Sequence, residues 1–155
     1  MVITEERESS INNKVEVSYL PQHLDNPITP ESADELAAVI DEMVSEVDSD
    51  QDYVTIILTS PRGKVAVLNI GILAGKGIGS IEYQGDDEGG NYSKGVEDVG
   101  RPVFYYDFGN PRFFPGDSRV AIDSIKQALV RFYETDGSRP DNINWQEWST
   151  EAVDW

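Results

Sequence analysis

The chain has 155 residues, of which 39% are hydrophobic and 10% aromatic, a composition typical of a single globular domain. Its 29 acidic residues against 12 basic ones give a formal net charge of −17, which disfavours direct binding to nucleic acid or to anionic membranes. The absence of cysteine excludes disulfides and thiol nucleophiles, and it fits a reducing cytoplasm, where we expect the protein.

The N-terminal third of the chain predicts one strand and one helix. Residues 1–13 are polar, and we expect a flexible segment there, ahead of a single domain over residues 14–155. Apolar and polar residues alternate over residues 14–20, which indicates a half-buried strand. Apolar residues then recur at helical spacing over residues 33–47, and Ser32 with Glu35 fits a capping box at the start of this helix.

Consecutive strands follow this helix. Residues 52–60 and 64–73 predict a hairpin around a turn at 61–63, and residues 79–85 predict a third strand. Residues 86–100 are rich in glycine and aspartate and predict a long loop. Residues 102–109 predict a fourth strand of the same meander, and residues 110–118 predict a turn.

A second helix and a short strand end the predicted domain. Apolar residues from Ile122 to Tyr133 share one helical face, Gly137 is expected at the C′ position, and a strand with Trp145 and Trp148 follows. Adjacent strands without intervening helices indicate an α+β fold. We therefore expect a central, mostly antiparallel β-sheet with two main α-helices packed against it.

The segment "NIGILAGKGIGS", residues 69–80, is similar to a phosphate-binding loop but departs from both known patterns. Gly71 and Gly75 are separated by three residues rather than four, and Lys76 is followed by Gly77 instead of a hydroxyl residue. The dinucleotide pattern fails because Gly79 comes one residue early. We interpret the segment as a turn between strands, with Lys76 exposed, Gly75 and Gly77 in unusual backbone conformations, and glycines where neighbouring chain packs closely.

No other motif predicts a catalytic, cofactor or metal site. In the acidic stretch that begins at residue 86, Glu88 and Glu97 fit an EF-hand loop, but Gly90 and Asn91 occupy positions that require other residues. His23, the only histidine, is interpreted as a surface residue. Two alternatives stay open: a small-ligand or calcium-binding domain, or an enzyme, using turn 75–80 or the acidic loop 86–98. A third alternative is that the chain is a dimerisation domain.

The C-terminal third carries a more specific pattern. The second helix leads into "FYETDGSRP", which is followed by a strand with tryptophan, so that Gly137, Arg139, Pro140 and Trp145 form a G-x-R-P…W arrangement. This arrangement resembles the Imm1 family of bacterial immunity proteins, which occur with polymorphic and interbacterial toxins, and the resemblance covers roughly residues 50–150. It implies a non-enzymatic protein that binds and blocks a cognate toxin. We interpret the four residues themselves as structural.

The resemblance also implies a partner, because some Imm1-like proteins neutralise deaminase-type toxins that act on nucleic acid. Such a toxin presents a basic cleft, and a strongly acidic domain would block it sterically and associate quickly. Binding residues concentrate in loops on a rigid sheet, which favours the long central loop, with Tyr92 as an aromatic anchor. The candidate toxin-binding residues are Asp86, Asp87, Glu88, Tyr92, Glu97 and Asp98. The protein itself is expected to be a monomer or a weak dimer.

Overall fold

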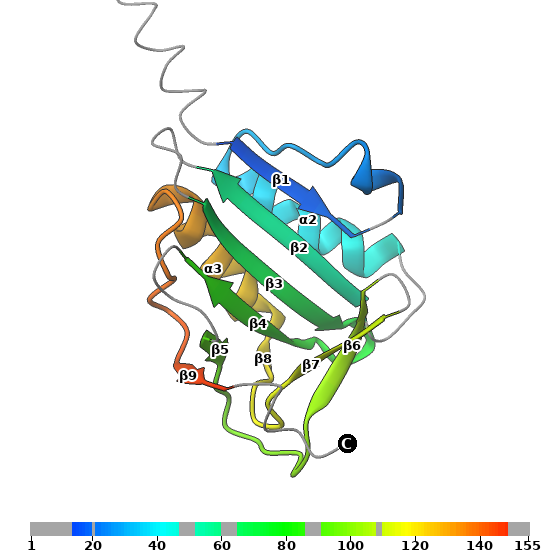
Figure 1. Ribbon diagram of the computed structural model, residues 1–155, viewed down its shortest axis with the longest axis vertical. Coiled ribbons are helices and arrows are strands. Elements are labelled where there is room, and N and C mark those ends of the chain that lie inside the picture. The colour runs from blue at the N-terminus through cyan, green and yellow to red at the C-terminus, as the bar shows by residue number, and fades with distance from the viewer. Residues whose placement is uncertain are drawn as a thin grey trace, which may run out of the picture.

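The computed structural model describes residues 14–19, 21–46, 52–59, 65–85, 91–107 and 110–148. The segment 1–13, expected to be flexible, and the expected turn at 61–63 lie outside these residues. Nine strands of the described residues form one sheet, and two α-helices cover one of its faces (Figure 1). The predicted α+β class with a mostly antiparallel sheet is confirmed. Within the described ranges, neither helix is long and apolar enough to cross a membrane.

The strand order is β7-β6-β2-β3-β4-β5-β9, with β1 also paired to β2 and β8 to β4. The described strands are β1 (Lys14–Ser18), β2 (Asp52–Thr59), β3 (Val65–Leu73), β4 (Ile78–Gln84), β5 (Asn91–Ser93), β6 (Val103–Asp107), β7 (Asn110–Phe114), β8 (Val120–Ala121) and β9 (Trp145–Glu147). Their pairings are antiparallel except that of β2 with β6, which is parallel and rests on the single pair Asp52 and Tyr106. Helix α2 (Ala33–Glu46) follows β1, and helix α3 (Ile122–Glu134) follows β8.

The first helix begins at the predicted capping box. The Glu35 backbone N–H donates to Ser32 Oγ at 3.1 Å, and the Ser32 hydroxyl in turn donates to Glu35 Oε2 at 3.3 Å. These bonds satisfy a backbone donor that the first helical turn leaves unpaired. The apolar face of α2 then buries Leu36 and Ile40 against the sheet, as the helical spacing predicted, and Val39 is buried as well.

The second helix ends in a Schellman motif. The Gly137 N–H donates to the Phe132 carbonyl at 2.8 Å, and the Asp136 N–H donates to the Tyr133 carbonyl at 3.3 Å. Both residues after the C-cap take positive φ, 60° at Asp136 and 91° at Gly137. Gly137 is therefore at C″, one residue later than the predicted C′ position, which Asp136 occupies.

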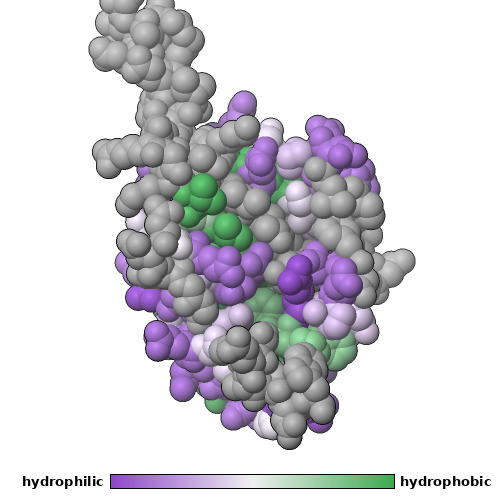
Figure 2. Space-filling model, in the orientation of Figure 1, coloured by the Kyte–Doolittle hydropathy of each residue, from purple (hydrophilic) through white to green (hydrophobic). Residues whose placement is uncertain are grey.

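Two hydrophobic clusters lie on opposite faces of the sheet. The larger cluster joins the helices to β1, β3 and β4, and it includes Ile72. The smaller cluster contains Leu73, Tyr92, Val103, Tyr105 and Phe114. Successive strand side chains point to opposite faces, so the second cluster lies on the face away from the helices. Figure 2 shows this face, where hydrophilic residues surround smaller hydrophobic patches.

The later strands depart from the predicted meander. β6 was expected beside β4, but it lies beside β2, because β5 and β8 occupy the edge of β4. The expected turn over 110–118 contains β7, whose Phe113 and Phe114 pair with Phe104 and Val103 in a hairpin. The expected loop over 86–100 contains β5, so Tyr92 is a strand residue.

The glycine-rich segment is a turn between strands, as predicted. It comprises the end of β3, a 3₁₀ turn, η2 (Ala74–Lys76), and the start of β4, with Lys76 exposed. Gly77 takes a φ of 65°, but Gly75 does not take a positive φ, which corrects that part of the prediction. A Cβ at Gly71 would overlap the Tyr105 ring, and one at Gly79 would overlap the Gly71 carbonyl oxygen. Close packing therefore explains these two glycines.

His23 is not a surface residue, contrary to the prediction. It lies in a 3₁₀ turn, η1 (Pro21–Leu24), and only 9% of its surface is exposed. Its Nδ1 accepts a hydrogen bond of 3.2 Å from the Tyr19 backbone N–H, and the two rings meet edge to face at 4.8 Å. The imidazole thus holds the turn that follows β1.

Candidate functional site

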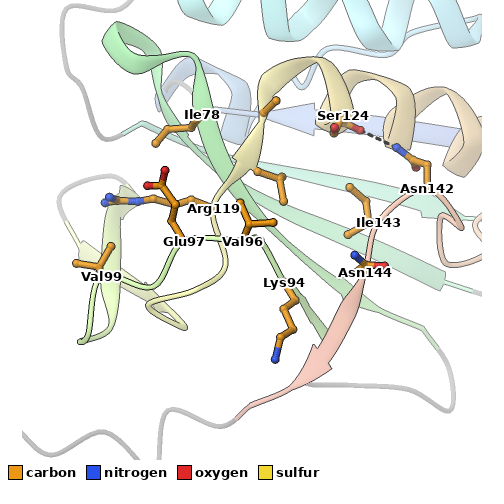
Figure 3. Close-up of a pocket in the computed structure, with 13 residues that line it drawn as sticks. Ile78, Lys94, Val96, Glu97, Val99, Arg119, Ser124, Asn142, Ile143 and Asn144 are labelled. Atoms are coloured by element: carbon orange, nitrogen blue, oxygen red, sulfur yellow. Dashed lines mark hydrogen bonds between the residues drawn. The ribbon is translucent and has the colours of Figure 1, made fainter.

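A pocket of about 430 Å³ lies where three separate segments of the chain meet (Figure 3). One wall is the loop over residues 94–100, which we call the rim loop. The second comprises residues 119–124, from β8 into the first turn of α3, and the third comprises residues 142–144 before β9. The lining residues are Ile78, Lys94, Gly95, Val96, Glu97, Val99, Arg119, Val120, Ala121, Ser124, Asn142, Ile143 and Asn144.

Backbone hydrogen bonds hold the rim loop in place. The Lys94 N–H donates to the Asn144 carbonyl at 2.7 Å, and the Gly95 N–H donates to the Asp117 carbonyl at 2.6 Å. At the other end of the loop, the Val99 N–H donates to the Gly116 carbonyl at 3.0 Å. A Cβ on Gly95 would overlap the backbone of residue 119, so this approach requires glycine. The backbone of the rim loop is therefore held in one conformation before any partner binds.

A network of buried hydroxyl groups connects the strands next to the pocket with the turn that leads into its second wall. Ser80 Oγ lies 2.8 Å from the Tyr105 hydroxyl and 2.7 Å from Ser118 Oγ. The Ser93 hydroxyl donates to the Ser118 carbonyl at 2.6 Å. Burial raises the pKa of Tyr105, while its hydrogen bonds to Ser80 and Arg119 act in the opposite direction. These contacts join β4, β5 and β6 to the turn that precedes Arg119.

Two polar atoms of the pocket lining are buried without a hydrogen-bond partner: Arg119 Nε and Asn142 Oδ1. Across the side chains that the structure describes, these are the only two such buried atoms. The amide of Asn142 is oriented by its Nδ2, which donates to the Ser124 carbonyl at 3.0 Å. The two residues reach the pocket from different sides (Figure 3). Buried polar groups usually have partners, so these two atoms are exceptions, and neither is accessible to solvent.

The rim loop presents apolar and acidic side chains to solvent. Val96 is fully exposed, and Val99 is 41% exposed. Glu97 and Asp98 are exposed between them, and Asp98 Oδ1 accepts the Gly100 N–H at 2.8 Å. The structure thus places two of the candidate toxin-binding residues, Glu97 and Asp98, beside the pocket.

The other candidate residues lie elsewhere. Asp86, Asp87 and Glu88 fall outside the described residues. Tyr92 is buried to 7% exposure, and its ring meets Phe114 and Trp148 edge to face at 5.6 and 5.3 Å. Burial and the charge and hydrogen bond of neighbouring Glu82 raise the pKa of Tyr92. Tyr92 therefore contributes to the second cluster rather than to the rim.

Glu82 itself is a buried acid on the sheet face away from the helices. Its Oε1 accepts from Asn69 Nδ2 at 3.1 Å, and its Oε2 accepts from Gln84 Nε2 at 2.9 Å. The side chains on either side of it in β4, Ile81 and Tyr83, point into the larger cluster. Neutral donors thus fix the orientation of this carboxylate.

Val96, Arg119 and Asn142 are the functional candidates that sequence reasoning missed. The two valines within a stretch of glycine and acidic residues, Val96 and Val99, were a usable signal for Val96. No sequence signal marks Arg119 or Asn142, because their importance depends on which polar atoms the fold leaves unpaired. Nor does any set of three or more histidine and acidic side chains in the described ranges form a metal-binding group.

The G-x-R-P…W residues make contacts within the chain. The Gly137 carbonyl accepts the Tyr83 hydroxyl at 2.8 Å, and an Arg139 terminal nitrogen donates to Asn91 Oδ1 at 3.1 Å. Trp145 Nε1 donates to the Pro140 carbonyl at 2.8 Å. The pattern therefore ties the end of α3 to β4, β5 and β9, and it positions residues 142–144 of the pocket.

Comparison with known proteins agrees with this arrangement. The family model Immunity protein Imm1 matches residues 25–147, which include both helices and the pocket. No curated protein matches the chain. The chain belongs to the Imm1 immunity protein family, and this membership implies that it is an immunity protein against a toxin.

Proposed function

We propose that this immunity protein binds a nucleic-acid-acting toxin of the deaminase type and inhibits it by steric occlusion, without catalysis of its own. The net charge of −17 supports this proposal, because a toxin that handles nucleic acid needs a basic substrate cleft. An acidic inhibitor is drawn to such a cleft and competes with the substrate phosphates. The toxin domain is accordingly its partner, in the cytoplasm, and the inhibitor acts as a monomer or weak dimer.

The observation that carries the choice of surface is the rim loop beside the pocket. It combines exposed apolar side chains, Val96 and Val99, with the exposed acids Glu97 and Asp98 on a backbone that is already held in place. Interfaces gain affinity from a few apolar anchors in pockets, while surrounding charges govern the rate of association. The acids at 86–88, which precede β5 in the sequence, are proposed as further toxin-binding residues.

Co-expression tests the function directly. The toxin domain encoded beside this gene is expressed in a bacterial host with and without the immunity protein, and cell survival and base substitutions in host nucleic acid are counted. Survival with few substitutions is expected only when the immunity protein is present, since a deaminase converts cytosine or adenine bases. Toxicity that persists despite stable co-expression would overturn the proposal. Toxicity that is rescued but never accompanied by base substitutions would remove the deaminase assignment.

A double substitution tests the acidic segment. Asp86→Lys with Asp87→Lys should weaken binding to that toxin domain, because it reverses two negative charges that would attract a basic cleft. Thermal unfolding of the variant should match the wild type. Unchanged affinity would move the interface away from residues 86 and 87.

A further inference from the structure

Two adjacent backbone carbonyls hold both ends of the rim loop. The Asp117 carbonyl accepts the Gly95 N–H at 2.6 Å, and the Gly116 carbonyl accepts the Val99 N–H at 3.0 Å. A Cβ on Gly116 would overlap the Arg101 carbonyl oxygen, so the chain that leaves the rim loop also lies against this turn. The conformation of the rim loop therefore depends on where the turn places residues 116 and 117.

The side chain of Gln146, in β9, reaches this turn from a distant part of the sequence. Its Nε2 donates to Asp117 Oδ1 at 2.8 Å and to the Ser93 carbonyl in β5 at 3.0 Å. A side-chain amide nitrogen carries two hydrogens, so these two bonds use both of them. Gln146 also pairs with Tyr92 where β9 lies beside β5 (Figure 1). One amide thus joins the turn that holds the rim loop to β5 and β9.

The other partner of the Asp117 carboxylate among the described residues is weaker. Lys94 Nζ lies 3.8 Å from Asp117 Oδ2, and the Lys94 side chain is 56% exposed. An exposed ion pair contributes little, because solvent screens it and a long side chain must be ordered. By contrast, the bond from Gln146 is partly buried, short and assisted by the charge of the carboxylate. Gln146 therefore fixes the Asp117 side chain more firmly than Lys94 does.

We propose that Gln146 is a positioning residue for toxin binding: its amide holds Asp117, and through that turn it keeps the rim loop in one conformation. The inference rests on the proposed function, which assigns the rim loop to the toxin. Gln146 lies outside the rim loop, and both of its hydrogen-bond acceptors belong to its own chain. It raises the affinity because a loop that is already ordered loses less conformational freedom when the toxin binds.

The buried serine network does not replace this contact. Ser118, the next residue of the turn, is held by Ser80 and Ser93, which fix the end of the turn that leads into β8. Those bonds are buried, whereas the bond between Gln146 and Asp117 is only partly buried. Loss of the Gln146 amide should therefore loosen residues 116 and 117 and the rim loop, while the rest of the fold persists.

Gln146→Met removes both donors and keeps the length of the side chain, and Gln127→Met makes the same change at an exposed position on α3 as the matched control. Amide hydrogen exchange of the free proteins, followed by NMR, reports on the loop directly. In Gln146→Met, protection of the Gly95 and Val99 amides should fall at least about tenfold, and that of Ile70 in β3 at most about threefold. Equal losses at all three amides, or no loss in the rim loop, would overturn the positioning role.

Binding to the toxin domain encoded beside the gene is measured by titration calorimetry. The Kd should rise about three- to tenfold in Gln146→Met and stay within about twofold of the wild type in Gln127→Met, since only molecules with the loop in place bind. If Gln146→Met loosens the loop but binds as tightly as the wild type, its role in binding is overturned and the proposed function stands. If the wild type does not bind, the proposed function falls with that role, whereas the exchange measurement still decides whether Gln146 holds the loop.

Gln146→Glu separates positioning from charge. It removes both donors and places a second carboxylate beside Asp117, and like charges repel at this distance. It also makes the chain more acidic, which by itself would strengthen the attraction to a basic toxin. Positioning therefore predicts a higher Kd for Gln146→Glu than for the wild type, measured by the same calorimetry. A lower Kd would assign the effect to charge and overturn the inference.

Discussion

Ser93 and Ser118, 25 residues apart in sequence, are joined by a 2.6 Å hydrogen bond from the Ser93 hydroxyl to the Ser118 carbonyl. The same hydroxyl accepts the Ile81 N–H at 3.1 Å, and both serine side chains are fully buried. One side chain in β5 thus connects β4 to the turn that carries Arg119. The shape of the pocket depends on this connection.

Ser93→Ala should lower the free energy of unfolding by about 1–3 kcal/mol, because it leaves the Ser118 carbonyl and the Ile81 N–H buried without this partner. Urea denaturation at neutral pH measures the change. Ser138→Ala is the matched control: its hydroxyl donates to the Thr135 carbonyl at 3.2 Å, but it is exposed, so a change within about 0.5 kcal/mol is expected. Equal losses in the two variants would contradict the importance of the buried bond.

Gly71→Ala should destabilise the protein by about 1–3 kcal/mol, because the new methyl group would overlap the Tyr105 ring. Replacing that ring in the same background, with Gly71→Ala and Tyr105→Leu together, should restore part of this loss. A double-mutant cycle by urea denaturation measures the coupling between the two positions. If the losses of stability in the two single variants simply added in the double variant, the new methyl group would not be in conflict with the Tyr105 ring.

Gly137→Ala should lower the free energy of unfolding by roughly 1–2 kcal/mol, since a φ of 91° is unfavourable for a residue with a Cβ. Gly137→Asn should lower it less, because asparagine tolerates left-handed conformations better than alanine does. Thermal unfolding followed by circular dichroism compares the three proteins. If the Gly137→Ala variant were as stable as the wild type, the Schellman motif would not require glycine at this position.

The stability should fall above about pH 10, the ordinary pKa of tyrosine. Burial raises the pKa values of Tyr92 and Tyr105 in the folded state. Above pH 10 the unfolded chain therefore loses protons that the folded protein retains, and ionisation favours unfolding, by up to about 1.4 kcal/mol per pH unit for each tyrosine. Urea denaturation between pH 8 and 11 measures the slope.

Tyr105→Phe provides the internal comparison for this pH dependence. The variant should lose stability less steeply above pH 10 than the wild type, although it is less stable at neutral pH because Ser80 loses a hydrogen-bond partner. If the free energy of unfolding fell equally steeply with pH in the variant and the wild type above pH 10, this would contradict a raised pKa of Tyr105. Below pH 9 the free energies of unfolding of the two proteins should depend on pH in the same way.

Glu97→Lys should slow association with the toxin domain severalfold at low ionic strength, with little change in the dissociation rate. Salt screens interactions between exposed charges, so the difference should shrink at high ionic strength. Stopped-flow mixing measures both rates. Glu134→Lys, at the exposed end of α3, changes the net charge equally and serves as the control. Equal slowing by both variants would assign the effect to net charge alone.

Both helices and most strands could be predicted from the sequence, because the signals that specify them are local. The capping box at Ser32 and the apolar spacing of α2 involve residues within a few positions of one another. The turn interpretation of residues 69–80 also followed from local spacing. By contrast, the prediction placed β6 beside β4, since the sequence of a strand does not record which edge is already occupied by β5 and β8.

The candidate site shows the same division. Composition alone determined the acidic character of the protein, and the local G-x-R-P…W pattern indicated the family that the whole-domain match then showed. Only the tertiary structure brought Val96, Arg119 and Asn142 around one pocket and buried Tyr92, the expected anchor. The physical reason is that side-chain exposure and unpaired hydrogen-bonding atoms depend on contacts between distant segments, which neither periodicity nor composition encodes.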